Sequence, residues 1–170
     1  MNKMKIDPVK RAIWEEIARD LSGTRSGVGV LGFDTDFCRF LRREAGLPFP
    51  LEAADPAAPA AGGSDGCDLF IGWQVLGRTN AILPPETVYG LLRNGGEALL
   101  YGHYRHPRPD DVREWESRIR RRDERANVRL PLPGAVSMQR ISGWLASSPF
   151  DRYTIRKKGI YYQAVLSKEE

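Results

Sequence analysis

Residues able to do chemistry stand at the ends of the apolar runs of this sequence. Asp34, Asp55, Trp73, Gln74 and His103 each follow or close a run that is typical of a strand. A carboxylate at such a point can accept hydrogen bonds from hydroxyl groups, and a histidine can take a proton from a reacting oxygen or nitrogen. Ligands of open α/β sheets bind beyond the carboxyl ends of the strands, so these positions are candidates for one site.

Each of these residues also has a plainer interpretation. Asp34 could cap the helix that follows it, and Asp55, which precedes a proline, could be an ordinary turn residue. Trp73 is flanked by apolar residues and could belong to the core. His103 could lie in a solvated loop. The sequence leaves both interpretations open for each residue.

The apolar runs predict the elements that would position these side chains. Runs without polar alternation indicate buried strands, and apolar residues recurring at intervals of three and four indicate helices. Lys158-Gly159 predicts a tight hairpin turn between two final strands. The expected strands are 28–33, a weak one at 49–53, 67–73, 98–101, 153–157 and 160–166, and the expected helices are 7–21, 35–45, 84–92, 110–126 and 137–147.

Strands that alternate with helices predict an α/β fold with a doubly wound, mostly parallel sheet. The closing hairpin adds antiparallel strands at the C-terminal end. We expect a single domain over residues 1–170, with an N-terminal helix and linker at 1–26 and the sheet core at 27–170. The length is sufficient for one hydrophobic core.

Composition excludes several classes of protein. The 41% of hydrophobic residues form no stretch long enough to span a bilayer, and the polar N-terminus does not read as a secretory signal. Two cysteines and two histidines offer no metal-ligand spacing and favour a reducing, cytoplasmic location. The net charge of +4 is modest, and acids interrupt the arginines at 118–125, which argues against nucleic-acid binding.

Four stretches in order resemble the class I S-adenosylmethionine (SAM) dependent methyltransferases, in particular the type 11-like members. Residues 30–34 resemble the second strand of that family, and residues 51–76 its third strand, a proline-containing loop and its fourth strand. Residues 88–101, "VYGLLRNGGEALLY", are similar to a helix, a Gly-Gly turn and the fifth strand. The closing hairpin resembles the sixth and seventh strands.

The resemblance implies a cofactor and a role for each candidate residue. Asp34 would accept hydrogen bonds from the ribose hydroxyls of SAM, and Asp55 would meet the adenine amino group. Trp73 and Gln74 would line the place where cofactor and substrate meet. His103 would be the candidate base acting on a methyl acceptor, which the sequence does not identify.

One departure from the family pattern bears on all of these roles. The family's first strand ends in a glycine-rich loop, where the backbone approaches the cofactor. Residues 3–6 are the one candidate for that strand, and no glycine follows them; we therefore expect a first strand that is missing, vestigial or supplied by another chain.

In an alternative register, residues 30–37 are the first strand with a degenerate loop, and Asp55 is the ribose acid. Gly27, Gly29 and Gly32 spell a dinucleotide fingerprint, but they lie inside an apolar run rather than after it.

The sequence thus supports three hypotheses. The first is an enzyme that transfers a methyl group from SAM to an unidentified acceptor. The second is an inactive methyltransferase-like protein that has lost SAM binding and serves as a partner or regulatory subunit in a homo- or hetero-oligomer, because unpaired strand edges favour association. The third and weakest is a basic RNA-associated module.

Overall fold

The computed structural model describes residues 6–22, 29–31, 35–47, 67–76, 84–128 and 135–169. Within these ranges the chain alternates between helices and strands, as the apolar runs predict. The elements are α1 (Pro8–Ser22), β1 (Gly29–Leu31), α2 (Thr35–Arg39), the π-helical turn η1 (Phe40–Glu44), β2 (Cys67–Trp73), α3 (Pro85–Leu91), β3 (Leu92–His103), α4 (Pro109–Arg122), α5 (Met138–Ala146), β4 (Arg152–Lys157) and β5 (Tyr161–Ser167).

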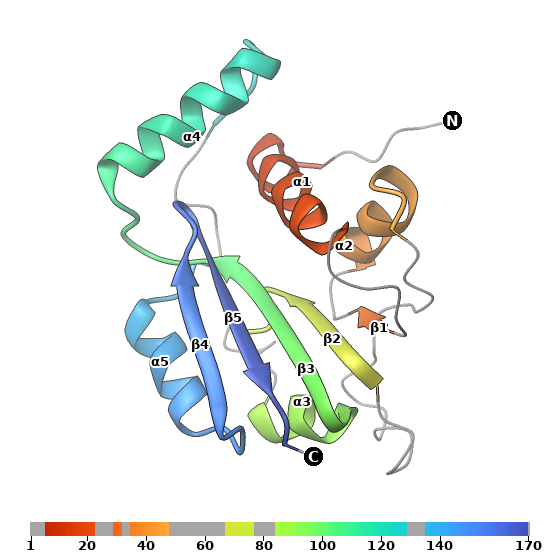
Figure 1. Ribbon diagram of the computed structural model, residues 1–170. Helices are drawn as coiled ribbons and strands as arrows, with labels where there is room; N and C mark the ends of the chain where they lie inside the picture. The colour runs from red at the N-terminus through yellow and green to blue at the C-terminus, as the bar shows by residue number, and fades with distance from the viewer. Residues whose placement is uncertain are drawn as a thin grey trace.

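The described strands form one sheet in the order β1-β2-β3-β5-β4. Strands β1, β2 and β3 run parallel, with Val30 beside Phe70 and Ile71 beside Leu99. The β4–β5 hairpin completes the sheet with antiparallel pairing. The predicted doubly wound α/β fold with a C-terminal antiparallel hairpin is confirmed (Figure 1).

The sheet order corrects the preferred assignment of strand β1. The resemblance treats residues 67–73 as the family's fourth strand, and in the doubly wound order three-two-one-four-five the fourth strand lies beside the first. Here β1 pairs directly with β2, so Gly29–Leu31 occupies the place of the first strand rather than the second. The alternative register is the one the topology supports, and the expectation of a missing central strand is wrong. Residues 3–6 lie partly outside the described ranges.

Alternation along the strands gives the sheet two buried faces. Trp73, Tyr101 and Tyr161 project toward α1, α2 and α4, while Phe70, Leu100 and Tyr162 project toward α3 and α5. Helices therefore cover both faces, and α1 lies over the upper ends of β2 and β3 (Figure 1). This arrangement buries the carboxyl ends of the parallel strands beneath a helix.

Local capping explains several of the helix boundaries. The Asp7 carboxylate accepts a hydrogen bond from Val9 N at 2.8 Å, so Asp7 caps α1. Ser137 Oγ accepts one from Arg140 N at 3.1 Å and caps α5 in the same way. The helix predicted at 35–45 widens into a π-helical turn at its C-terminal end, because Ala45 N donates to Phe40 O, five residues back. Gly46, at a φ of 67°, then ends the turn.

Strand β3 is longer than the predicted strand at 98–101. The Asn94-Gly95-Gly96 segment, expected to be the turn that ends a helix, belongs to the strand. The extension is stabilised by the end of β5, because Gly95 N donates to Lys168 O at 3.0 Å and Lys168 N donates to Gly96 O at 2.9 Å. The Lys168 ammonium also donates to the carbonyls of Tyr89 and Leu92 at the end of α3.

No helix in the described ranges is both long and apolar enough to cross a membrane. The same ranges contain no group of three or more histidine, cysteine, aspartate or glutamate side chains placed to hold a metal ion.

Candidate functional site

The described candidate residues meet at the carboxyl edge of the sheet. Trp73 is the last residue of β2 and His103 the last of β3, and both lie on the face that α1 covers. Trp73 pairs with Tyr101 across β2 and β3, and His103 pairs with Tyr161 across β3 and β5. Three neighbouring strands therefore bring aromatic and polar rings together under one helix.

Trp73 lies in the core, with 2% of its surface exposed. Its ring centroid is 5.8 Å from that of Trp14 in α1, 5.9 Å from that of Phe37 in α2 and 5.0 Å from that of His103. Edge-to-face pairs at such distances add to the stability gained by burial. The ring thus links the two helices to the strand ends.

Gln74 joins the end of β2 to the end of β3. Its backbone has a φ of 55°, in the left-handed region, and its N–H donates to Tyr101 O at 2.8 Å. The side-chain Oε1 accepts a hydrogen bond from His103 N at 3.1 Å. A Cβ atom at Gly102 would lie 2.4 Å from this oxygen, so the connection requires glycine at that position.

His103 is buried rather than solvated, with 2% of its surface exposed. Burial, and secondarily the positive charge of Lys10, lowers the pKa of its imidazole to about 3. The ring is therefore neutral near pH 7. Its Nε2 atom is itself buried and has no hydrogen-bond partner in the described part of the protein, which is uncommon for a buried polar atom.

Other polar side-chain atoms are buried on the same face of the sheet, which α1 covers. The indole nitrogens of Trp14 and Trp73 are buried and have no partner among the described residues. Burial raises the pKa of Tyr101 to about 12, and the Tyr101 hydroxyl accepts a hydrogen bond from Gln163 Nε2 at 3.2 Å. Burial, followed by the charge of Glu16, also raises the pKa of Tyr161. Sequence analysis missed Trp14 and Tyr161; the apolar stripe of α1 and the alternation of β5 are the signals that could have found them.

The two predicted acids, Asp34 and Asp55, lie outside the described residues, so their roles stay predictions. In the register that the topology supports, Asp34 follows the first strand in the sequence, and the resemblance would make Asp55 the ribose acid. No glycine occurs between residues 33 and 45. Phe37 and Cys38, early in α2, are instead buried against the core of α1 and β2.

The order of the strands defines a doubly wound α/β protein, a fold in which ligands bind beyond the carboxyl ends of the strands. Solved structures show which fold this is. A SAM-dependent methyltransferase from Thermotoga maritima, described as a possible histamine N-methyltransferase, has a TM-score of 0.53 at 13% identity over 94% of this chain and 95% of its own. A candidate SAM-dependent methyltransferase from Methanococcus maripaludis has a TM-score of 0.55 at 14% identity over 100% and 97%.

Human N-acetylserotonin methyltransferase in complex with SAM has a TM-score of 0.54 at 13% identity, over 95% of this chain and 54% of its own. The chain therefore has the fold of the class I SAM-dependent methyltransferases. No protein-family model matches the sequence, and no curated protein is significantly similar to it.

Of the groups that a SAM site would need, the described candidate residues offer two unpartnered polar atoms at the strand ends. Trp73 Nε1 and His103 Nε2 are buried polar atoms without partners at the strand ends, and the side-chain oxygen of Gln74 is already bonded to β3. Trp73 and Gln74 would thus support the bound molecule from below. The groups that would hold its ribose and adenine are the predicted acids.

Proposed function

We propose that this protein binds SAM at the carboxyl edge of β1, β2 and β3 and transfers its methyl group to an acceptor. The observation that carries the proposal is the pairing of β1 with β2. This pairing gives the protein the first strand, whose end carries the cofactor loop in the methyltransferase fold. The shared fold of the solved methyltransferases supports the same place for the cofactor.

Each candidate residue has a role in this proposal. Asp55 would accept hydrogen bonds from the ribose hydroxyls, and Asp34 would lie in the loop beside the cofactor. Gln74 holds the ends of β2 and β3 together, which fixes His103. When bound, SAM supplies a methyl group on a positively charged sulfur, which an acceptor oxygen or nitrogen can attack.

The buried state of His103 limits what it does in that reaction. A neutral imidazole can accept a hydrogen bond from an acceptor hydroxyl or amine through Nε2 and so orient it. With a pKa of about 3 under the closed α1 helix, His103 is a weak base, so we assign it positioning of the acceptor. Trp14 and α1 exclude water from the strand ends.

Isothermal titration calorimetry with S-adenosylhomocysteine, the product form of the cofactor, tests the proposal. We expect saturable binding to the wild-type protein. We expect at least about tenfold weaker binding for Asp55→Ala, because hydrogen bonds to a charged group contribute roughly 1.5–3 kcal/mol. We also expect weaker binding for Asp34→Ala, because its carboxylate would lie beside the cofactor. Asp151→Ala is the matched control, since Asp151 is exposed in the segment that precedes β4. Unchanged affinity in both acid variants would refute the assignment.

One observation favours a second candidate function, a methyltransferase-like subunit without catalysis. After Gly32, which directly follows β1, the sequence has no glycine before Gly46, and fully buried Phe37 packs near Trp73. Bulky side chains there would block backbone approach to the cofactor. A folded protein that shows no heat of binding at millimolar S-adenosylhomocysteine supports this candidate, and its mass by light scattering then reports whether it associates.

A further inference from the structure

A groove of about 610 Å³ lies on the flank of α1 that faces away from the sheet. The wall on one side comes from η1 and that on the other from the C-terminal end of α4. Its residues in α1 include Arg11, Glu15 and Arg19, whereas the sheet-facing side of the same helix carries Ile13 and Ile17. The groove is thus separate from the carboxyl ends of the strands, which lie beneath α1.

The floor of the groove is apolar. Phe40, Ala18 and Ala45 line it, and Phe40 and Ala18 are buried. These side chains carry no hydrogen-bonding groups and lie between two charged rims. Phe40 and Ala18 are already buried and Ala45 is partly exposed, so an apolar side chain of a ligand would chiefly cover Ala45.

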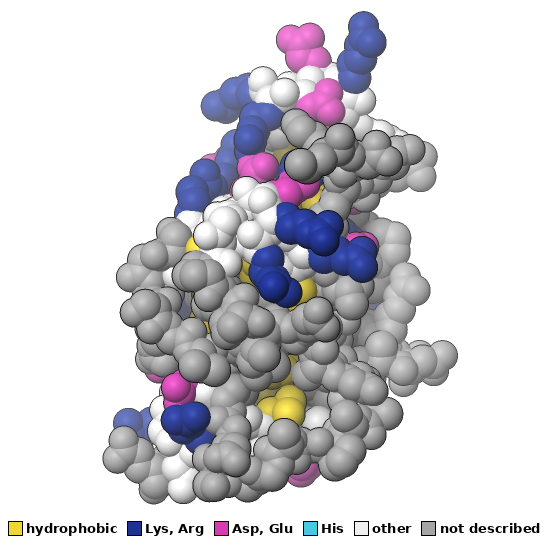
Figure 2. All heavy atoms as spheres, turned by 90° about the vertical axis from the view of Figure 1, so that its right-hand side faces the viewer, with side chains coloured by type: hydrophobic (Ala, Val, Ile, Leu, Met, Phe, Trp, Pro, Cys, Tyr) yellow, Lys and Arg dark blue, Asp and Glu magenta, His cyan; other side chains and the backbone are white. Residues whose placement is uncertain are grey.

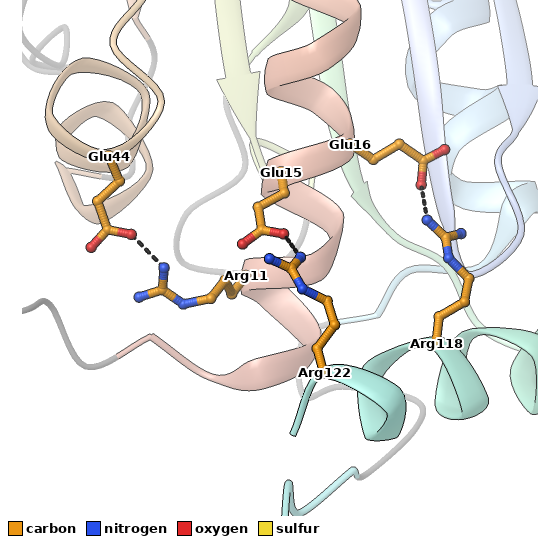
Figure 3. Close-up of polar contacts among 6 residues, drawn as sticks. All are labelled: Arg11, Glu15, Glu16, Glu44, Arg118 and Arg122. Atoms are coloured by element: carbon orange, nitrogen blue, oxygen red, sulfur yellow. Dashed lines mark hydrogen bonds and ion pairs between the residues drawn. The ribbon is translucent and has the colours of Figure 1, made fainter. Parts of the chain in front are cut away.

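Ion pairs between helices line both rims. The Arg11 guanidinium pairs with Glu44 of η1, and Arg122 of α4 pairs with Glu15 (Figure 3). Further along α1, Arg118 pairs with Glu16 at 3.7 Å and stacks on Trp115. Exposed ion pairs of this kind contribute little to stability, so a ligand can take over one partner of each pair at small cost.

Positive charge exceeds negative charge around the groove. Arg42 and Arg43 are exposed on η1 and make no ion pair within the described part of the chain. Arg121, at the end of α4, is exposed as well. On the side of the molecule drawn in Figure 2, lysine and arginine side chains gather in the upper part, with a few acidic side chains between them. The surface therefore favours a ligand of net negative charge.

The groove presents both hydrogen-bond donors and hydrogen-bond acceptors, which limits the chemical class of its ligand. Guanidinium groups only donate hydrogen bonds, and the carboxylates of Glu15 and Glu44 only accept them. An extended peptide has both backbone N–H and C=O groups and satisfies both kinds. A nucleic-acid backbone offers mainly acceptor oxygens, which the two carboxylates would repel, and the groove exposes no aromatic ring for base stacking.

From these observations we propose that the groove between α1, η1 and α4 binds an acidic peptide segment of a partner protein, with one apolar side chain seated on Phe40, Ala18 and Ala45. The arginines of the rims bind its acidic side chains, as arginine clusters do in other acidic-motif sites. The proposal does not depend on SAM binding, because no groove residue lies at the strand ends.

Fluorescence anisotropy with a labelled probe peptide of four glutamates around a central leucine tests this site. We expect binding that weakens as salt is raised. Arg11→Ala combined with Arg122→Ala should weaken it at least about tenfold, equivalent to roughly 1.4 kcal/mol. Replacing the central leucine of the probe by serine should weaken it as well. The matched control is Arg152→Ala combined with Arg156→Ala. Both arginines lie on the exposed strand β4, and this variant should leave binding unchanged.

A second variant tests the groove in case the variant with both Arg11→Ala and Arg122→Ala does not fold. Ala45→Glu adds a negative charge to the groove wall, leaves every arginine in place, and should also weaken binding of the acidic probe. The proposal is overturned if the acidic probe does not bind, or if the β4 control loses as much affinity as the groove variant. It is also overturned if an oligouridylate of equal charge binds with the same dependence on Arg11 and Arg122.

Discussion

Substitution of Gly102 by alanine tests the junction between the strand ends. A Cβ atom at this position would lie 2.4 Å from Gln74 Oε1 and 2.9 Å from the ring and hydroxyl of Tyr162. Tyr162 is fully buried and cannot move away easily. The Gln74 side chain would have to rotate, and the buried His103 N–H would lose its acceptor.

The expected cost of Gly102→Ala follows from these two effects. Overpacking of a buried site costs about 1–3 kcal/mol, and a buried N–H left without a partner costs roughly 1–3 kcal/mol. Because the two effects share one side chain, we expect a total loss of about 2–4 kcal/mol in the free energy of unfolding. The stability measurement is urea denaturation followed by circular dichroism.

Gly143→Ala is the matched control for this substitution. Gly143 lies inside α5, and a Cβ atom there would meet nothing within 4 Å. Alanine should therefore raise stability by up to about 1 kcal/mol through helix propensity. The reasoning would be refuted by a Gly102→Ala variant within about 0.5 kcal/mol of the wild type, the range of an ordinary surface substitution.

Two further predictions concern the buried His103 and the glycine turns. His103 binds a proton in the unfolded protein below pH 6.5 but in the native protein only near pH 3, so stability should fall as the pH falls; from pH 6.5 to 5 the loss is about 2 kcal/mol. His103→Phe should remove that dependence in urea denaturation at the two pH values, and an unchanged dependence would contradict the burial of His103. Gly159→Ala forces alanine to a φ of 82° and places its Cβ 2.4 Å from Trp115 Nε1, so it should lower stability by about 2–4 kcal/mol. Gly46→Ala, at a φ of 67° with open space around it, should cost only about 1–2 kcal/mol, and equal losses at the two glycines would count against the contact with Trp115.

Local signals predicted several elements well. Both ends of α1 were predicted to within one residue. The signals were an acid at position 7, Pro8 and the apolar stripe of Ile13 and Ile17. The strand at 67–73 was predicted with the bounds it has in the structure, because an unbroken apolar run is typical of a strand buried on both faces. Ser137, the first residue of the helix predicted at 137–147, caps α5 through its side chain.

Features that depend on tertiary pairing were not predictable in the same way. The apolar run at 28–33 indicates a strand, but nothing in it says which strand will lie beside it, so the choice between second and first strand needed the observed pairing with β2. The extension of β3 through Gly95 depends on hydrogen bonds from Lys168, more than 70 residues away. His103 is buried because Gln74 adopts a left-handed backbone and bonds to β3, a contact no local pattern contains.

Hydrogen–deuterium exchange with and without S-adenosylhomocysteine tests the central claim most directly, since it locates the ligand along the chain. The account predicts slower exchange in the peptides that follow β1, β2 and β3, including Gln74 and His103, and in the α1 helix that covers them. Slower exchange confined to other segments, or none at millimolar ligand, would contradict the placement of a SAM site at the carboxyl edge of this sheet.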